Sequence, residues 1–249
     1  MNSLEQLMAW VRKQVVPTEE QGIVAVGLLT YLTRRAIVRH CLARLPRGAR
    51  VLEIGSGEGL TIKGLSRRTD LKLHGLELRF DLIQHTRNQF NVYPPPSPLP
   101  SPIKGEGEAH WGPAHSPTFV QGNALTLPFP SQTFDAVICV NLLISIPAPS
   151  WDTLIKECFR VSKPNQPVFF DIRNSLNPLI WLQTMAQPWL APHLSFTFQN
   201  TSPFRFADLL RRHEIKIGRH LPVGAPVWLL APVILFECRR SAPQSDVPR

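Results

Sequence analysis

A glycine-rich turn between a short apolar strand and a helix restricts the fold of this chain more than any other feature. Residues 50–54 predict a buried strand, and residues 60–65 predict the first turns of a helix. The segment from Glu53 to Gly59 joins them and is rich in glycine. Glycine lets the chain reverse tightly and lets a ligand approach the backbone, and the helix start favours an anionic group. The turn therefore predicts a ligand site at the carboxyl end of a strand.

The same alternation of strand and helix continues along the chain. Further strands are predicted at residues 71–78, 118–121, 134–140, 167–172, 215–217 and 228–238. Further helices are predicted at residues 81–90, 151–161 and 204–213. This order is typical of βαβ units. The sequence therefore predicts an α/β fold, with a doubly wound, Rossmann-like, mostly parallel sheet of about seven strands and helices on both faces.

Three segments depart from this alternation, within what we interpret as a single domain over residues 1–249. Residues 1–47 predict an N-terminal helical extension of two helices that are separated at Pro17, with Thr18 as the N-cap of the second. Residues 92–117 contain eight prolines and predict a disordered or polyproline-like surface insertion. Residues 174–200 are rich in Pro, Trp and Phe and have no clear period.

Charge and composition limit the partners of the chain only loosely. The net charge of +9 favours anionic partners such as nucleic acid or lipid headgroups, but it also serves solubility. The arginines are spread in pairs along the chain, which favours the second interpretation. Apolar runs at residues 22–32 and 221–236 are shorter than the roughly 20 residues of a membrane span. We expect a cytoplasmic protein without a transmembrane segment.

The four cysteines predict neither disulfides nor a metal site. They are Cys41, Cys139, Cys158 and Cys238, and no two of them form a CxxC pair. Cysteine in apolar surroundings usually behaves as a small hydrophobic residue. This usage fits a reducing compartment.

The spacing within the glycine-rich turn separates two classes of nucleotide-binding loop. A dinucleotide-binding G-x-G-x-x-G loop needs its third glycine at position 60, which is Leu60. The third glycine is instead Gly59, and the acidic Glu53 stands two positions before the first glycine. This E-x-G-x-G-x-G arrangement resembles motif I of the class I S-adenosylmethionine-dependent methyltransferases.

Other motifs extend the resemblance over roughly residues 51–171. Glu77 ends the second predicted strand, where the family has an acidic residue that binds the cofactor ribose, and Leu78 would lie beside the adenine. The remaining similar runs are Gly122-Asn123-Ala124, Leu127-Pro128-Phe129-Pro130, Phe134-Asp135 and Glu157 to Pro164. The resemblance implies S-adenosylmethionine as the cofactor. It implies a cofactor site made of Glu53, Gly55, Ser56, Gly57, Gly59, Glu77, Leu78, Asn123 and Ala124. Asn141 joins this predicted site because it ends the fourth predicted strand, where open α/β sheets bind cofactor or substrate.

Two departures from the family pattern are compatible with a relative that has lost catalysis. Asn123 stands where the family has Asp, which accepts a hydrogen bond from the adenine amino group, and an Asn carbonyl oxygen can accept it as well. The turn from Pro164 to Pro167 reads Pro-Asn-Gln-Pro, where the family has Pro-Gly-Gly. Asn165 tolerates a left-handed conformation, so we expect this turn to form.

Three functions follow from the resemblance. The first is methyl transfer to a small, hydrophobic acceptor, similar to the quinone-biosynthesis methyltransferases, with residues 174–200 covering the acceptor. The second is an RNA or protein methyltransferase, which the net charge of +9 favours. The run Asn141-Leu142-Leu143-Ile144 is no Asn-Pro-Pro-Tyr-type tetrad, which disfavours methylation of nucleic-acid amino groups. The third is a non-catalytic S-adenosylmethionine-binding module.

No catalytic residue is predicted. Asp171 and His193 fall in segments near the expected acceptor side, and a structural role is the preferred interpretation of both. Contact with a membrane surface is a further expectation, compatible with each of the three functions.

Overall fold

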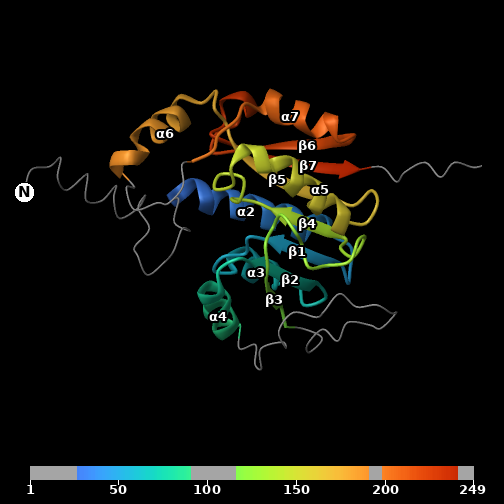
Figure 1. Cartoon of the computed structure of the whole chain (residues 1–249). Helices are drawn as coiled ribbons and strands as arrows, with labels where there is room; N and C mark the ends of the chain where they lie inside the picture. Colours follow the sequence, from blue (N-terminus) through green and yellow to red (C-terminus); the bar gives the residue numbers. More distant parts are fainter. Residues whose placement is uncertain (1–26, 91–115, 191–197, 241–249) are drawn as a thin grey trace, which may run out of the picture.

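The chain forms a seven-stranded sheet in the order β3-β2-β1-β4-β5-β7-β6 (Figure 1). The computed structural model describes residues 27–90, 116–190 and 198–240. The strands are β1 (Arg50–Ile54), β2 (Lys72–Glu77), β3 (Thr118–Gln121), β4 (Ala136–Cys139), β5 (Val168–Arg173), β6 (Ile215–Val223) and β7 (Val233–Arg240). Strands β1 to β5 pair in parallel, and β7 runs antiparallel to both β5 and β6. This is the predicted doubly wound arrangement, and its order reverses between β1 and β4.

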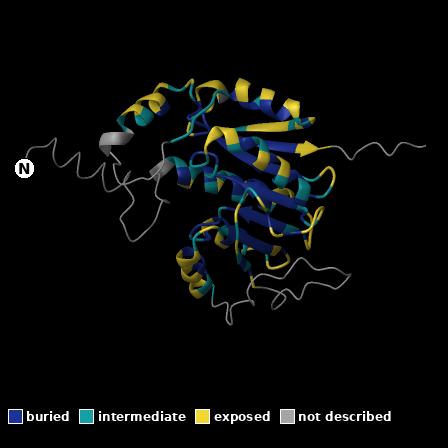
Figure 2. Ribbon diagram, viewed as in Figure 1, coloured by how far each residue is buried: buried dark blue, intermediate teal, exposed yellow. Residues whose placement is uncertain are grey.

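Helices cover both faces of the sheet, as the sequence predicts. The first face carries α2 (Gly27–Arg44), α3 (Leu60–Leu65) and α4 (Phe80–Gln89), whose buried residues share one core cluster with Phe169 of β5. The second face carries α5 (Trp151–Val161) and α7 (Pro203–Arg212), which pack with Phe170 of β5. Figure 2 shows the central strands between these layers as largely buried, whereas the edge strand β6 is largely exposed or half-buried. Burial on both faces explains why the parallel strands are nearly continuous apolar runs.

Two predicted strands differ by more than two residues at one end from the observed strands. β6 extends from the predicted residues 215–217 to Val223 and includes Pro222. A proline fits there because β6 is an edge strand, where one ladder hydrogen bond is dispensable. The predicted strand at residues 228–238 starts later, at Val233, because Trp228–Leu230 form the short 3-10 helix η3 and Pro232 precedes the strand.

The helix α6 (Pro178–Leu190) is one that periodicity did not reveal. It lies within residues 174–200, for which the sequence predicts no regular element. Large apolar side chains of this helix are exposed, among them Leu179, Trp181, Leu182 and Met185, whereas Ile180 is buried. Because its exposed face is as apolar as its buried face, α6 lacks the polar–apolar contrast by which a surface helix is recognised.

Some predictions concern residues outside the described ranges. These are the first N-terminal helix, the N-cap at Thr18, most of the insertion at residues 92–117, and His193. The second predicted N-terminal helix is present from Gly27 onward as α2. None of the helices in the described ranges has the length and hydropathy of a membrane span.

Glu157 and Arg160 of the E-x-x-R run attach α5 to the loop that follows β3. The Arg160 guanidinium donates to the carbonyl oxygens of Leu127 at 2.9 Å and Phe129 at 2.8 Å, and it pairs with Glu157 at 2.6 Å. The Glu157 carboxylate in turn accepts the N–H of Leu127 at 2.7 Å. The two similar runs therefore hold each other in place on the second face of the sheet.

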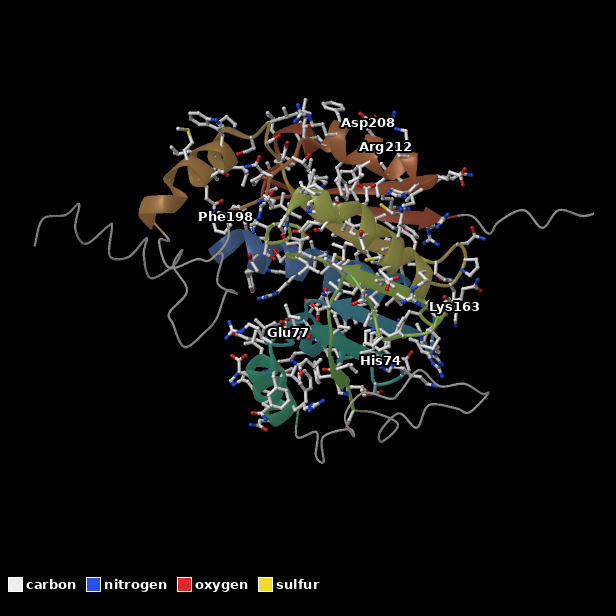
Figure 3. The ribbon with its side chains drawn as sticks, in the orientation of Figure 1. His74, Glu77, Lys163, Phe198, Asp208 and Arg212 are labelled. Carbon is white, nitrogen blue, oxygen red and sulfur yellow. The ribbon has the colours of Figure 1, made fainter. Side chains whose placement is uncertain are left out.

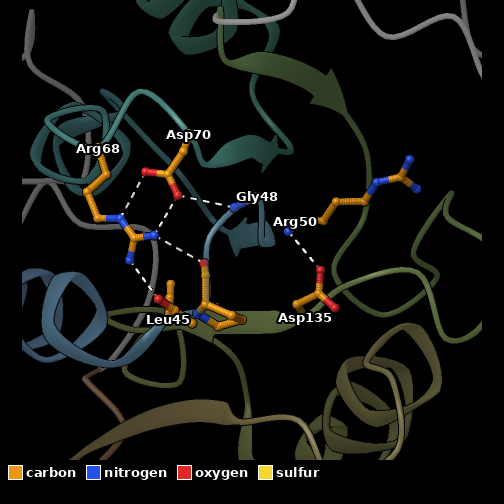
Figure 4. Close-up of polar contacts among 7 residues, drawn as sticks. Leu45, Gly48, Arg50, Arg68, Asp70 and Asp135 are labelled. Atoms are coloured by element: carbon orange, nitrogen blue, oxygen red, sulfur yellow. Dashed lines mark hydrogen bonds and ion pairs between the residues drawn. The ribbon is translucent and has the colours of Figure 1, made fainter.

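Asp135 joins two other motif segments at the amino edge of the sheet. Its carboxylate accepts the backbone N–H of Arg50 at 2.9 Å and pairs with Lys163 at 2.6 Å. Figure 4 shows the Arg50 contact beside a second carboxylate, Asp70, which pairs with Arg68 and accepts the N–H of Gly48 at 3.1 Å. These contacts fix the chain entering β1, so these motif residues stabilise the fold.

The role of Arg160 predicts a measurable loss of stability. Arg160→Ala leaves two carbonyl oxygens and Glu157 without their donor, so we expect the free energy of unfolding to fall by about 1–3 kcal/mol. Arg211→Ala is the matched control, because Arg211 pairs with Asp208 at the same i,i+3 spacing on an exposed surface. We expect that control to change stability by less than about 1 kcal/mol in urea denaturation. Equal losses in the two variants would contradict the assigned role.

Candidate functional site

The glycine-rich turn lies at the carboxyl edge of the sheet, between β1 and α3. Gly55, Gly57 and Gly59 all adopt positive φ angles, of 73°, 52° and 68°. The N–H groups of Gly55 and Ser56 both donate to the carbonyl oxygen of Leu76 on β2, at 2.8 Å and 2.9 Å. The turn therefore folds over the end of the neighbouring strand, and a ligand on the turn also lies near β2.

Close packing is a second reason for glycine in this turn. A Cβ atom on Gly59 would lie 2.6 Å from Cγ2 of Thr86 on α4 and 3.2 Å from Cε2 of Phe90. A Cβ atom on Gly55 would lie 3.0 Å from Cδ1 of Leu142, in the loop after β4. The absent side chains allow α4 and the β4 loop to approach the turn from opposite sides.

Glu77 places a carboxylate at the end of β2, next to the turn. Its oxygens accept the N–H groups of Gly57 at 3.0 Å, Leu78 at 2.9 Å and Arg79 at 3.0 Å. The side chain is half-buried, and a carboxylate has further lone pairs for a ligand. In Figure 3, Glu77 and Phe198 lie toward the same edge of the molecule, whereas His74 and Lys163 lie toward the opposite edge.

The predicted residues after β3 also come together beside Glu77. Gly122 donates its N–H to the carbonyl oxygen of Glu77 at 3.0 Å. Asn123 is exposed, and its Oδ1 accepts the N–H of Leu125 at 2.9 Å, so this side chain shapes the turn. Ala124 is half-buried, and Leu78 is 64% exposed. These residues present a partly apolar surface at the ends of β2 and β3.

Glu53 lies buried beneath the turn and close to α2. Burial raises the pKa of Glu53 to about 7, and a hydrogen bond with the Thr61 hydroxyl and the positive charge of Arg34 offset this only in part. Burial also lowers the pKa of Arg34, while Glu53 and Glu58 raise it by their negative charge. Arg34 is therefore a cation of the site that the sequence analysis missed. Its only signal was its place in the Arg34-Arg35 pair.

Asn141 occupies the loop that follows β4, at the switch point of the sheet. Its φ of 58° lies in the left-handed region, which few residues other than glycine adopt. Its N–H donates to Oδ1 of Asp171 on β5 at 2.6 Å. Asp171 is buried, which raises the pKa of its carboxyl group, although Arg173 and the Asn141 N–H oppose this rise. Asp171 thus holds Asn141 in place, which matches the structural role preferred for it.

Arg173 ends β5 on the face that α2 covers, and the sequence analysis missed it. It is 4% exposed, and its Nη2 donates to Oγ1 of Thr30 on α2 at 3.3 Å. Burial lowers the pKa of the guanidinium, and the charge of Asp171 opposes this change. Across the described ranges, no three side chains of His, Cys, Asp or Glu gather as metal ligands would.

Buried polar atoms without hydrogen-bond partners gather at this edge of the sheet. Among them are Ser56 Oγ, both amide atoms of Asn141, and Arg173 Nη1. Each such atom costs about 1–3 kcal/mol, so folded proteins keep few of them without a function. Their positions at the carboxyl ends of β1, β4 and β5 indicate a polar ligand that satisfies them.

This fold and this site resemble an α/β domain of the class I methyltransferase type, in which the turn after β1 lies beside the acidic end of β2. Residues 52–170 match the family described as a methyltransferase domain. That part of the chain, slightly less than half of it, is similar to methyltransferase domains. The motifs that suggested the resemblance lie within or next to this range.

Curated relatives resemble only part of the chain. A fatty-acid O-methyltransferase of Mycolicibacterium smegmatis is 32% identical over 47% of this chain and 34% of its own length. A sterol 24-C-methyltransferase of Gibberella zeae is 28% identical over 52% of this chain and 30% of its own length. A demethylmenaquinone methyltransferase of Anoxybacillus flavithermus is 45% identical over 20% of this chain and 21% of its own length. The matched stretch thus spans at most about a third of these relatives.

Solved structures resemble the fold over a longer range. Magnesium protoporphyrin IX methyltransferase from Synechocystis, crystallised with S-adenosylhomocysteine, has a TM-score of 0.62 and 16% identity over 96% of both chains. A 4+2 cyclase has a TM-score of 0.60 and 15% identity, and the match covers 86% of this chain and 83% of the cyclase. At such low identity the likeness concerns the fold alone.

The contacts of Gly59 predict a large effect of one added methyl group. Gly59→Ala places a side chain at an unfavourable φ and puts its Cβ 2.6 Å from Cγ2 of Thr86. We therefore expect the free energy of unfolding to fall by about 2–4 kcal/mol. Gly48→Ala is the control, because Gly48 has a φ of 72° and nothing within 4 Å of an added Cβ. We expect it to cost only about 1 kcal/mol in the same denaturation experiment. The difference between the variants measures the steric clash.

The pKa of Glu53 predicts a pH-dependent cost to stability. The carboxyl group titrates near 7 in the folded protein and near 4.5 when exposed. Between these values the unfolded chain releases the proton first, so a rising pH should remove about 3 kcal/mol of stability, fully lost above about pH 7. Glu53→Gln lacks this titration. Its stability relative to the wild type should therefore rise from pH 5 to pH 8. A difference independent of pH would show that Glu53 does not titrate in this range.

Proposed function

We propose that this protein transfers a methyl group from S-adenosylmethionine to a small, apolar acceptor. The unsatisfied buried polar atoms at the ends of β1, β4 and β5 carry this proposal. They lie on the strands around the switch point where open α/β sheets bind ligands, next to the turn and to Glu77. Such a site suits a cofactor with several polar groups.

In this proposal the residues of the first part of the sheet bind the cofactor. The Glu77 carboxylate accepts hydrogen bonds from the ribose hydroxyls. It uses the lone pairs that its three backbone N–H donors leave free. Leu78 and Ala124 contact the adenine. The carbonyl oxygen of the Asn123 side chain accepts a hydrogen bond from the adenine amino group with its second lone pair. The chain offers these groups in the positions that the family motifs imply.

The methionine end of the cofactor carries an ammonium and a carboxylate, which suit the second part of the site. Gly55, Ser56, Gly57 and Gly59 provide the close backbone approach and the free Ser56 hydroxyl. Glu53 pairs with the ammonium, and Arg34 pairs with the carboxylate. Asn141 offers a donor and an acceptor at the end of β4.

The bound cofactor supplies an electrophilic methyl group, and the chain supplies position and exclusion of water. Residues 198–201 support this division of labour, because they cross the carboxyl edge near the site. Gln199 donates its N–H to Ile144 at 2.8 Å, and Thr201 donates to Arg173 at 3.0 Å. This segment therefore lies beside the ends of β4 and β5, where we place the acceptor.

Two observations support an apolar acceptor. Residues 174–204 contain no charged side chain apart from the titratable His193, and exposed apolar side chains gather on α6. The curated relatives are named for fatty-acid, sterol and demethylmenaquinone methylation. The same apolar surface is compatible with a peripheral membrane contact through which such an acceptor arrives.

Calorimetric titration with S-adenosylmethionine tests the proposal. We expect a dissociation constant in the micromolar range, on the order of −8 kcal/mol, and no heat from NAD. Glu77→Ala should weaken binding about 10- to 100-fold, because charged hydrogen bonds to the ribose are lost. Asp81→Ala is the control, since Asp81 is an exposed carboxylate that pairs with Arg79 at the start of α4.

The outcomes separate the three candidate functions. No binding to the folded wild type would exclude the proposal. Binding without methylation of apolar acids, quinols or sterols would favour the non-catalytic module. Salt-sensitive binding of RNA together with RNA methylation would favour the nucleic-acid alternative.

A further inference from the structure

Arg173 is a buried cation whose hydrogen-bonding capacity is only partly used. Its Nη1 is buried without a hydrogen-bond partner, and its Nη2 makes only a long contact of 3.3 Å with Thr30. Asp171 lies close enough to attract its charge but accepts its hydrogen bond from Asn141. A guanidinium has five N–H donors in a fixed planar fork, which matches a carboxylate. The unused part of Arg173 therefore points to an anionic ligand group.

The position of Arg173 separates it from Glu77, which we assign to the cofactor ribose. Arg173 ends β5, and β4 and β1 stand between β5 and β2, which ends in Glu77. Neighbouring strands are about 4.8 Å apart, so Arg173 and Glu77 are roughly 14 Å apart across the sheet. Arg34 lies nearer the glycine-rich turn, where Glu53 and Glu58 attract it, and it is the cation assigned to the cofactor carboxylate. Arg173 remains for the second substrate.

We propose that Arg173 binds the carboxylate of the methyl acceptor, so that the protein esterifies an apolar carboxylic acid. This inference rests on the proposed function, since it names the acceptor group of the same reaction. Thr30, which already contacts Arg173, has a neighbouring hydroxyl that can bind the second carboxylate oxygen.

The chemistry of a carboxylate acceptor fits the residues of the site. One carboxylate oxygen attacks the methyl carbon, the new C–O bond forms, and the S–C bond breaks with its electron pair going to sulfur. No proton is transferred, so no general base is needed, and Asp171 remains free to hold Asn141. The negative acceptor and the positive sulfonium become two neutral groups, and a water-poor site favours such a loss of charge.

The surroundings of Arg173 suit an acid with an apolar tail. Asn174 follows it directly and donates to the carbonyl oxygens of Leu229 and Ala231, at 2.8 Å and 3.0 Å. This joins the start of α6 to the loop before β7. The exposed large apolar side chains of the two segments are Leu176, Leu179, Trp181, Leu182, Met185, Val227, Leu229 and Leu230. They provide the apolar surface beside the buried cation.

Paired probes test this assignment. Binding of dodecanoate and of methyl dodecanoate is measured by tryptophan fluorescence, with S-adenosylhomocysteine present, and binding of S-adenosylmethionine is measured by calorimetry. We expect the wild type to prefer the acid about 10-fold or more, since only the acid forms a charged pair with Arg173. Arg173→Met should abolish this preference and leave cofactor binding within about twofold. Arg34→Met should do the opposite, weakening cofactor binding while the preference for the acid persists.

Further variants distinguish a loss of folding from a loss of carboxylate recognition. Arg205→Met removes an exposed arginine of α7 and should change neither readout. Arg173→Met leaves Asp171 without its neighbouring cation, so the double variant Asp171→Asn, Arg173→Met removes both charges and provides a folded test if the single variant unfolds. Arg173→Lys should keep part of the preference, because it keeps the charge but loses the planar fork.

Other outcomes would overturn the assignment. It fails if the wild type binds acid and ester equally, or if Arg173→Met weakens cofactor binding as much as Arg34→Met does. If the wild type binds no cofactor but prefers the acid through Arg173, the carboxylate site stands and the proposed methyl transfer fails. Formation of methyl dodecanoate by the wild type, detected by mass spectrometry, would support both.

Discussion

The carbonyl oxygen of Leu76 holds together the part of the molecule on which the site depends. It accepts the N–H groups of Gly55 and Ser56, so the turn after β1 is fastened to the end of β2. This contact requires β1 and β2 to pair in the observed parallel register, with Ile54 opposite Leu76. The next N–H of the turn, that of Gly57, then meets the Glu77 carboxylate. A shift in strand register would separate the turn from its acidic partner and would dismantle the cofactor side of the site.

The motif residues divide between the two edges of the sheet according to what they do. At the carboxyl edge, the glycine-rich turn, Glu77 and Asn141 leave atoms free for a ligand. Away from this edge, Arg160 donates hydrogen bonds to carbonyl oxygens of the loop after β3. Asp135 pairs with Lys163 and accepts the N–H of Arg50. Such pairs use their hydrogen-bonding capacity within the protein. The resemblance to the family therefore reflects a shared scaffold as well as a shared site.

A layer of buried charge lies between α2 and the sheet near this edge. Glu53, Asp171 and Arg173 are each buried, and Arg34 of α2 lies close to Glu53. Desolvation disfavours every one of these charges, as the shifts in their pKa values show. The apolar packing on both faces of the sheet offsets this cost. A charged ligand that pairs with these side chains would recover part of the desolvation cost. This recovery is the physical basis of both proposals.

The sequence by itself determined the order of strands and helices, the turn from Glu53 to Gly59, the acidic end of β2 and the left-handed turn at Asn165, which has a φ of 60°. These features are set by local periodicity and by the few residues that tight turns accept. Only the tertiary structure decided that Arg34, Asp171 and Arg173 converge on the ligand edge. Their meeting depends on which strands are neighbours and on which face α2 covers, and no local pattern encodes either. The structure alone also showed α6, because an apolar helix with an exposed face has no periodic contrast. It alone showed that Asp171 holds Asn141, because a hydrogen bond between residues of different strands has no signature along the chain.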